Sequence, residues 1–113
     1  MRREADAYLR DIDDAAGLIE QFTAGRSLAD YLQNPMLRAA VERQFEIIGE
    51  ALAQLVKRDA PRAARIRDHR RIIAFRNILI HGYADVDNHL VWDIVVGMLP
   101  LLRRDIAALL GDR

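Results

Sequence analysis

Apolar residues recur at spacings of three and four along most of the chain, and this is the period of a helix with one buried face. The first such stripe consists of Ala5, Tyr8, Ile12, Ala15, Ile19 and Phe22. Gly25 then provides a helix stop, and Ser27 with Asp30 three residues later resembles the capping box that begins a helix. We therefore predict one long helix and, after it, a short helix that ends near Gln33.

A second long helix is predicted from Pro35 to about Asp59. Asn34 can cap it, and a proline at the first helical position sacrifices no hydrogen bond. One apolar stripe consists of Val41, Phe45, Ile48, Leu52 and Leu55. A second stripe beside it consists of Leu37, Ala40, Gln44, Ile47 and Ala51. Two stripes indicate a helix that packs against more than one neighbour, as in the middle of a bundle, and Pro61 is expected to break it.

A third segment, from about Asp68 to His81, is also expected to be helical. Its inward-facing residues are Ile72, Phe75 and Leu79. Gly82 follows directly, and we expect it to adopt the left-handed conformation in which many helices end.

The last helix is predicted to begin at a cap formed by Asp87 or Asn88. Its apolar set is Val91, Ile94, Val95, Met98, Leu101, Leu102, Ile106 and Leu109. Pro100 lies within this set, and a kink is expected there because the apolar pattern continues in phase. No segment alternates with period two for long enough to be a strand. The predicted fold class is therefore all-α, an up-and-down bundle of four to five helices in a single domain, residues 1–113.

Composition limits the classes of protein to which the chain can belong. It has 113 residues, of which 51% are hydrophobic and 30% charged, a balance typical of one globular domain. The absence of cysteine excludes disulfides and thiolate metal sites, and the zero net charge gives no overall attraction to nucleic acid or membrane. The start of the chain lacks a signal-peptide pattern, and the apolar run 95–102 is too short to cross a membrane. We expect a cytoplasmic protein.

The polar residues that interrupt the third helix are the strongest candidates for chemistry. Arg76 and His81 are five residues apart, so roughly 140° separates them around a regular helix, whereas Asn77 and His81 share a face. Cleavage of RNA without a metal needs a base, an acid and a fixed positive charge on the phosphorane. A single histidine would have to serve both proton transfers, and a two-fold dimer would supply a second Arg76 and a second His81. The alternative is that both residues simply bind the carbonyls at the helix end.

The motif and its flanks resemble those of a known family. The Arg-x4-His-x-Tyr signature of HEPN superfamily ribonucleases, in its HepT-like form, is matched by Arg76, Asn77, His81, Gly82 and Tyr83. The preceding helix, residues 40–51, and the acidic cap and tryptophan that follow, residues 86–92, are similar to that family too. The resemblance covers about residues 35–105.

The resemblance implies a HEPN-like bundle that forms a homodimer, with the motifs of two subunits lining one cleft. It implies a metal-independent endoribonuclease toxin in which Arg76 and His81 are catalytic. Its partner would be a small nucleotidyltransferase antitoxin, MntA-like, that transfers AMP to Tyr83. The sequence departs from the family pattern at His69, where tryptophan is expected, and at residues 74–75, where Gly-Met is common. Substrate preference therefore stays open.

Basic residues gather just before the motif. Between residues 57 and 76 there are eight basic and two acidic residues, and the candidates for binding RNA or phosphate are Arg67, Arg70 and Arg71. The open alternatives are a solvated helix face or a surface for an acidic partner.

Two further polar residues are expected to support the motif. Glu50, on the preceding helix, is expected to orient Arg76, and Asn77 either orients His81 or bonds to backbone. The spacing of metal ligands is absent among the three histidines, His69, His81 and His89, so no metal or cofactor is predicted. The alternative function is that of a non-catalytic helical partner, which binds a nucleotidyltransferase or a nucleotide.

Overall fold

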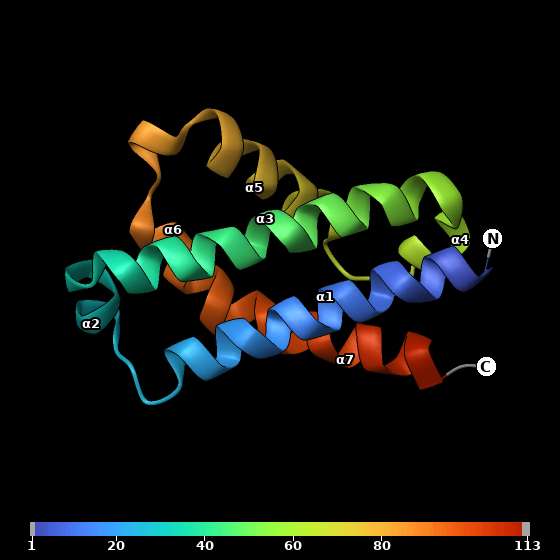
Figure 1. Cartoon of the computed structure of the whole chain (residues 1–113), viewed down its shortest axis with the longest axis horizontal. Coiled ribbons are helices and arrows are strands. Elements are labelled where there is room, and N and C mark those ends of the chain that lie inside the picture. The colour runs from blue at the N-terminus through green and yellow to red at the C-terminus, as the bar shows by residue number, and fades with distance from the viewer. Residues whose placement is uncertain (1, 112–113) are drawn as a thin grey trace.

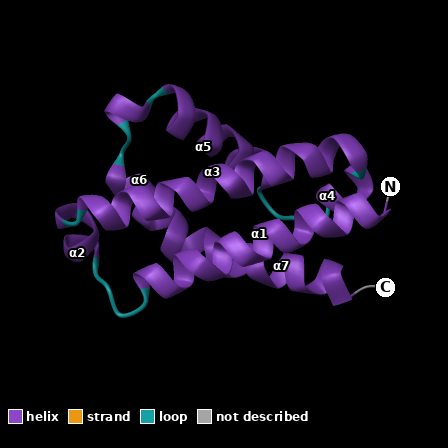
Figure 2. Ribbon diagram, viewed as in Figure 1, coloured by secondary structure: helices purple, strands orange, loops and turns teal. Residues whose placement is uncertain are grey.

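The computed structural model of the chain describes residues 2–111, and all regular secondary structure in this range is helical (Figure 2). The elements are α1 (Arg2–Thr23), α2 (Leu28–Gln33), α3 (Pro35–Arg58), α4 (Ala60–Ala63), α5 (His69–His81), the 3-10 turn η1 (Tyr83–Asp85), α6 (Asn88–Asp93), the π-helical segment η2 (Ile94–Met98) and α7 (Leu99–Gly111). No helix in the described range is both long and apolar enough to span a membrane.

The long helices form an up-and-down bundle with α3 in its middle (Figure 1). Helices α1 and α3 run antiparallel side by side, α7 packs against α1, and α5 packs against α3. The short helices α2 and α6 contact one another at one end of the bundle, and the two chain termini lie at the other end. The predicted all-α fold class is confirmed, and so is the expectation that the second long helix touches more than one neighbour.

The contact between α3 and α5 holds the motif in place. The predicted inner stripe of α3 is buried throughout, and it consists of Val41, Phe45, Ile48, Leu52 and Leu55. On α5 the buried residues are the predicted ones, Ile72, Phe75 and Leu79. The rings of Phe45 and Phe75 meet edge to face, with centroids 5.3 Å apart. This apolar contact fixes α5 on α3 along the length that carries the motif.

Three predicted helix caps are formed as expected. The Ser27 side chain accepts from the Asp30 backbone N–H at 3.1 Å, and the Ser27 N–H donates to the Asp30 carboxylate at 2.9 Å, which completes the capping box. The Asn34 side chain accepts from the Leu37 N–H at 3.0 Å. Asp87, rather than Asn88, caps α6 by accepting from two backbone N–H groups. These bonds span three residues or fewer, and for that reason the sequence pattern can predict them.

The prediction that Gly82 is left-handed is wrong. Its φ is −110°, and its N–H donates to the Ile78 carbonyl at 2.8 Å before the chain turns into η1. A Cβ at this position would lie 3.0 Å from the same carbonyl oxygen. A glycine is favoured at position 82 because a side chain would crowd the helix end, and not because the backbone has a positive φ.

The two interior prolines behave differently from one another. Pro61 ends the α3 segment as expected, but the chain begins a new turn at once, because Asp59 caps α4 and Pro61 occupies its first turn. Pro100, where a kink was expected, is preceded by the π-helical segment, in which the Leu99 N–H donates to the Ile94 carbonyl. A proline has no N–H and crowds the carbonyl four residues earlier, so a widened turn accommodates it. The widened turn also changes which residues of the helix face the core. Leu99, which lies outside the predicted stripe, is buried.

Candidate active site

Arg76 lies where α5 crosses α3, and a glycine of α3 makes room for it. A Cβ added to Gly49 would lie 2.2 Å from Arg76 Cβ and 2.6 Å from Arg76 Cγ. Carbon atoms of residues that are not bonded to one another do not approach so closely. The crossing as it stands therefore requires a residue without a side chain at position 49. The base of the Arg76 side chain therefore rests directly on the α3 backbone.

The tip of Arg76 faces a carboxylate on the same helix as Gly49. Arg76 Nη1 lies 3.3 Å from Glu50 Oε2, and the other carboxylate oxygen of Glu50 accepts from Gln54 Nε2 at 3.2 Å. The Arg76 side chain is 18% exposed and that of Glu50 is 57% exposed. Among the described residues, Arg76 Nε is buried without a hydrogen-bond partner, so only the outer nitrogens of the guanidinium are available to a ligand. The structure thus brings Glu50 to Arg76, as the sequence suggested, and adds Gln54.

Gly49 and Gln54 were not predicted from the sequence to belong to this arrangement. Gly49 could have been noticed because it lies inside a strongly apolar helix. A glycine there makes the helix less stable than an alanine would, by about 1 kcal/mol, so its presence suggests a close contact with a neighbouring element. Gln54 carried no comparable signal, because an exposed glutamine on a helix is ordinary.

His81 and Asn77 are both exposed on α5. His81 is the last residue of the helix, and within the described part of the chain its side chain forms no hydrogen bond or ion pair. No side-chain hydrogen bond joins Asn77 to His81 among the described residues, so the supporting role of Asn77 stays a prediction. An exposed imidazole at a helix end is free to exchange protons with a substrate.

Tyr83 is the first residue of η1 and is 79% exposed. The α-helix ends two residues before it, so the phenol does not continue the regular helix that carries Arg76. Arg76 is turned toward α3, whereas His81 and Tyr83 are exposed. Among the described residues, no hydrogen bond or ion pair joins these three side chains to one another.

Most of the basic segment before the motif is neutralised by nearby carboxylates. The Arg67 N–H and Nη2 each donate to Asp105 on α7 at 2.9 Å, and these bonds hold the pKa of Asp105 below its usual value. Arg58 pairs with Glu4, and Arg62 pairs with Asp6. Asp105 already offsets the charge of Arg67, and the proposed contact of Arg67 with RNA stays a prediction.

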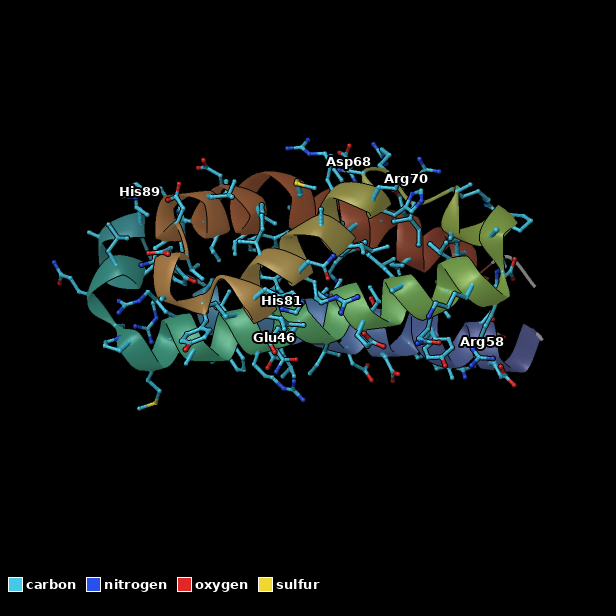
Figure 3. All side chains as sticks on the ribbon, turned by 90° about the horizontal axis from the view of Figure 1, so that it is seen from above. Glu46, Arg58, Asp68, Arg70, His81 and His89 are labelled. Atoms are coloured by element: carbon cyan, nitrogen blue, oxygen red, sulfur yellow. The ribbon has the colours of Figure 1, made fainter. Side chains whose placement is uncertain are left out.

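Arg70 and Arg71 stand at the opposite end of α5 from His81. Figure 3 shows Arg70 beside Asp68 at the start of the helix, with His81 at its far end. Arg71 is exposed and lies 4.0 Å from Asp68. Arg70 and His81 are eleven positions apart in the helix, a rise of about 16 Å. Arg70 and Arg71 are therefore well separated from His81 along α5, and their proposed contact with RNA stays a prediction.

Two grooves flank α5. The first lies between α1 and α3 and is closed by Ile80 of α5, with a volume of about 300 Å³. The second lies between α5 and α6, with a volume of about 210 Å³, and its apolar walls include Ile78 and Leu90. A larger and shallower hollow between α1 and α7 surrounds Arg103 and contains no residue of the motif. In the described part of the chain, no three potential metal-ligating side chains gather at one point.

Comparisons with known proteins show the family of the chain. The family model described as Ribonuclease HepT-like matches residues 12–109. A protein of Methanocaldococcus jannaschii, named as a candidate RNase, is 32% identical over 105 residues, which cover 93% of this chain and 95% of that protein. A protein of Thermococcus cleftensis named "Probable ribonuclease HepT" is 36% identical over 103 residues, covering 91% of this chain and 93% of the relative.

A further relative shows that the same unit occurs within a longer protein. It comes from Methanocaldococcus jannaschii, is named as both a gamma-glutamylcyclotransferase and a candidate RNase, and is 32% identical over 112 residues. The match covers 99% of this chain but 50% of that protein. No solved structure gives a significant match. The family model spans most of the chain, including Arg76, His81 and Tyr83, and the chain therefore belongs to the HepT-like ribonuclease family and is an RNA-cleaving enzyme.

Proposed function

We propose that this protein is a metal-independent endoribonuclease toxin whose catalytic residues are Arg76 and His81. The observation that carries the proposal is the seating of Arg76 on Gly49, with its tip beside Glu50, on the helix that ends in an exposed His81. A guanidinium that is already fixed in position needs little reorganisation when negative charge develops on a phosphate. An exposed imidazole can accept or donate a proton.

The proposed reaction is an internal transfer at the scissile phosphate. A base removes the proton from the 2′-hydroxyl, O2′ bonds to phosphorus, and the bond from phosphorus to O5′ breaks. An acid then donates a proton to O5′, which leaves a 2′,3′-cyclic phosphate and a 5′-hydroxyl end. His81 serves in proton transfer, and Arg76 stabilises the additional negative charge on the phosphorane. Before RNA binds, Glu50 partly offsets the Arg76 charge.

A homodimer would complete this site. In one protomer Arg76 faces α3 and His81 faces solvent, and a single imidazole must otherwise serve as both base and acid. Ile78, next to the buried Leu79, is 48% exposed, and together with the 39% exposed Leu90 it lines the groove between α5 and α6. Pairing of two α5 ends through Ile78 and Leu90 would bury apolar surface and bring a second His81 into reach.

Tyr83 is the proposed target of a nucleotidyltransferase antitoxin. Its phenol is exposed and lies two residues beyond His81, so a transferred AMP would add bulk and negative charge beside the site. Co-expression with such an enzyme should raise the intact mass by one or more AMP units. Tyr83→Phe should prevent the increase, and no increase in the unaltered chain would contradict this form of regulation.

The test of the nuclease is cleavage of RNA by purified protein in EDTA. We expect cleavage by the unaltered chain and a loss of at least about 100-fold in His81→Ala and Arg76→Ala, which is in the range of a lost acid-base or charge-stabilising group. Expression of the unaltered chain should arrest bacterial growth, whereas His81→Ala should not. Intact RNA and normal growth with all three proteins would instead favour a non-catalytic partner.

A further inference from the structure

The groove between α1 and α3 shares a residue with the catalytic arginine. Glu50 lines this groove and also lies 3.3 Å from Arg76 Nη1. Ile80, which closes the groove from α5, immediately precedes His81. Figure 3 looks down onto α5 and α3 and shows Glu46, another lining residue, in the same part of the molecule as His81. A phosphate on Arg76 would therefore have this groove at its side.

The walls of the groove suit a flat ring. Tyr8 of α1, Ile47 and Ala51 of α3, and Ile80 of α5 provide aromatic and aliphatic surface. The volume of about 300 Å³ is at the small end of the range for pockets that hold small molecules. Proteins that read single-stranded RNA place unstacked bases against such surfaces and bond to the base edges.

The polar residues at the groove are mainly hydrogen-bond acceptors. Asp11, Glu46 and Glu50 each contribute a carboxylate. The carboxylate of Asp11 has no hydrogen bond or ion pair among the described residues, and the carboxylate of Glu46 lies 3.6 Å from the guanidinium of Arg43. Burial, with a smaller contribution from the charge of Glu46, raises the pKa of the adjacent Glu42. Negative charge is thus concentrated along this edge of α3.

Carboxylates distinguish between bases by their hydrogen-bond donors. Adenine, cytosine and guanine carry an exocyclic amino group, and a carboxylate accepts hydrogen bonds from such a group. Uracil has no amino group, and its one N–H is flanked by two carbonyl oxygens that a carboxylate would repel. The groove therefore favours the amino-bearing bases over uracil.

The rival occupant is a cationic side chain of a partner protein, which the three carboxylates would also attract. Arg43 lines the groove as well, and its guanidinium can bind the phosphate of a nucleotide, which a cationic side chain does not offer.

We propose that this groove binds the base of a nucleotide next to the scissile phosphate and selects a base with an exocyclic amino group. The proposal rests on the proposed nuclease function for its role in cleavage, but it predicts nucleotide binding independently of cleavage.

The first experiment measures binding without turnover. Methyl groups of Ile47, Ala51 and Ile80 are followed by NMR in the full chain during titration with 5′-GMP, 5′-CMP or 5′-UMP. Shifts that saturate with GMP and CMP at concentrations well below those needed with UMP support the proposal. Equal shifts with all three nucleotides, or shifts only with an arginine-rich peptide, would overturn it.

The second experiment measures selection during cleavage. Oligonucleotides with one ribonucleotide in a 2′-O-methyl background restrict the cut to one position, and the base on each side of it is varied. We expect kcat/KM to be roughly tenfold or more higher when an amino-bearing base replaces uracil on one side, as for a single good carboxylate contact. Equal cleavage for every base would overturn the proposal.

Substitutions on α1 provide a matched pair of variants. Asp11 lines the groove, whereas Asp14, on the same helix, lines the hollow between α1 and α7. Asp11→Asn and Glu46→Gln should each reduce the base preference several-fold, and Asp14→Asn should retain it. If the unaltered chain cleaves no oligonucleotide yet binds GMP at these methyl groups, the nuclease proposal fails and the binding site stands.

Discussion

At the scale of single residues, the surroundings of a side chain decide what it can do. Arg76 and Tyr31 are both polar groups placed against apolar helices, but they have different surroundings. Arg76 keeps its outer nitrogens accessible next to Glu50. Tyr31 is fully buried, its hydroxyl has no hydrogen-bond partner in the described part of the chain, and burial raises its pKa. The guanidinium of Arg76 is therefore accessible to a ligand, whereas Tyr31 only packs in the core.

Gly49→Ala should disturb the active site through Arg76. The new Cβ would overlap Arg76 Cβ, whose position is fixed by the backbone, so α3 and α5 must separate. We expect a loss of about 1–3 kcal/mol in the free energy of unfolding, typical of overpacking, and a large decrease in RNA cleavage. Denaturant unfolding and a cleavage assay below the melting temperature measure the two effects.

Gly97→Ala is the matched control for this substitution. A Cβ at Gly97 would meet nothing within 4 Å, so its stability should be unchanged or rise by up to about 1 kcal/mol. Equal cleavage by the two alanine variants would show that the close approach at Gly49 has no part in positioning Arg76.

Tyr31→Phe should leave the fold intact and cost no stability. The substitution removes a buried hydroxyl that has no partner, while the contact of the ring with Trp92, at 5.4 Å between centroids, is retained. We expect the free energy of unfolding to stay the same or increase by about 1 kcal/mol. Urea denaturation measures this, and a decrease of 1 kcal/mol or more would indicate a hydrogen bond that the hydroxyl does make.

At the scale of elements, polar contacts between distant segments hold the connections of the bundle. The chain between α4 and α5 is tied to α7 because Arg67 binds Asp105 through both its backbone and its guanidinium. This tie sets where α5 begins, and so contributes to the placement of Arg76 on α3. The basic run that looked like a surface for RNA is in part a set of such structural ion pairs.

Asp105→Asn should change how stability depends on pH. The bonds from Arg67 lower the pKa of Asp105 in the folded state, so the carboxylate contributes stability above its unfolded pKa of about 3.9. That contribution is lost as the pH falls through the lower, folded pKa. We expect the unaltered chain to be more stable than Asp105→Asn at pH 7, and the difference to shrink below about pH 4.

The exposed Asp93 supplies the comparison for this experiment. Asp93→Asn should leave both the stability and its pH dependence close to those of the unaltered chain. Urea unfolding midpoints from pH 7 down to pH 3 measure the effect, and parallel curves for the three proteins would contradict the role of the Arg67–Asp105 pair.

At the scale of the whole molecule, the bundle leaves apolar surface exposed beside the motif. Exposed Ile78 and the groove beside Leu90, which flank α5, offer this surface to the proposed second subunit. The helices that position the motif are nevertheless packed within one chain, through the contacts of α3 with α1 and α5. Folding and assembly should therefore be separable.

Ile78→Glu should separate assembly from folding. A charge at this exposed position should not disturb the core, but it should weaken the proposed dimer by at least about tenfold and reduce cleavage in parallel, since a desolvated unpaired charge is unfavourable. Light scattering, circular dichroism and the cleavage assay measure mass, fold and activity. Met36→Glu, at an exposed position at the start of α3, should change none of them.

The sequence by itself determined the helices, their caps and the identity of the motif. These depend on a period of 3.6 residues and on side chains that bond to backbone within three residues, as at Ser27 and Asn34. Tertiary structure decided the rest: the seating of Arg76 on Gly49, the bond of Arg67 to Asp105, and the groove formed by three helices. Each of these joins residues at least 27 positions apart, and no local pattern records which faces of two helices will meet or how closely.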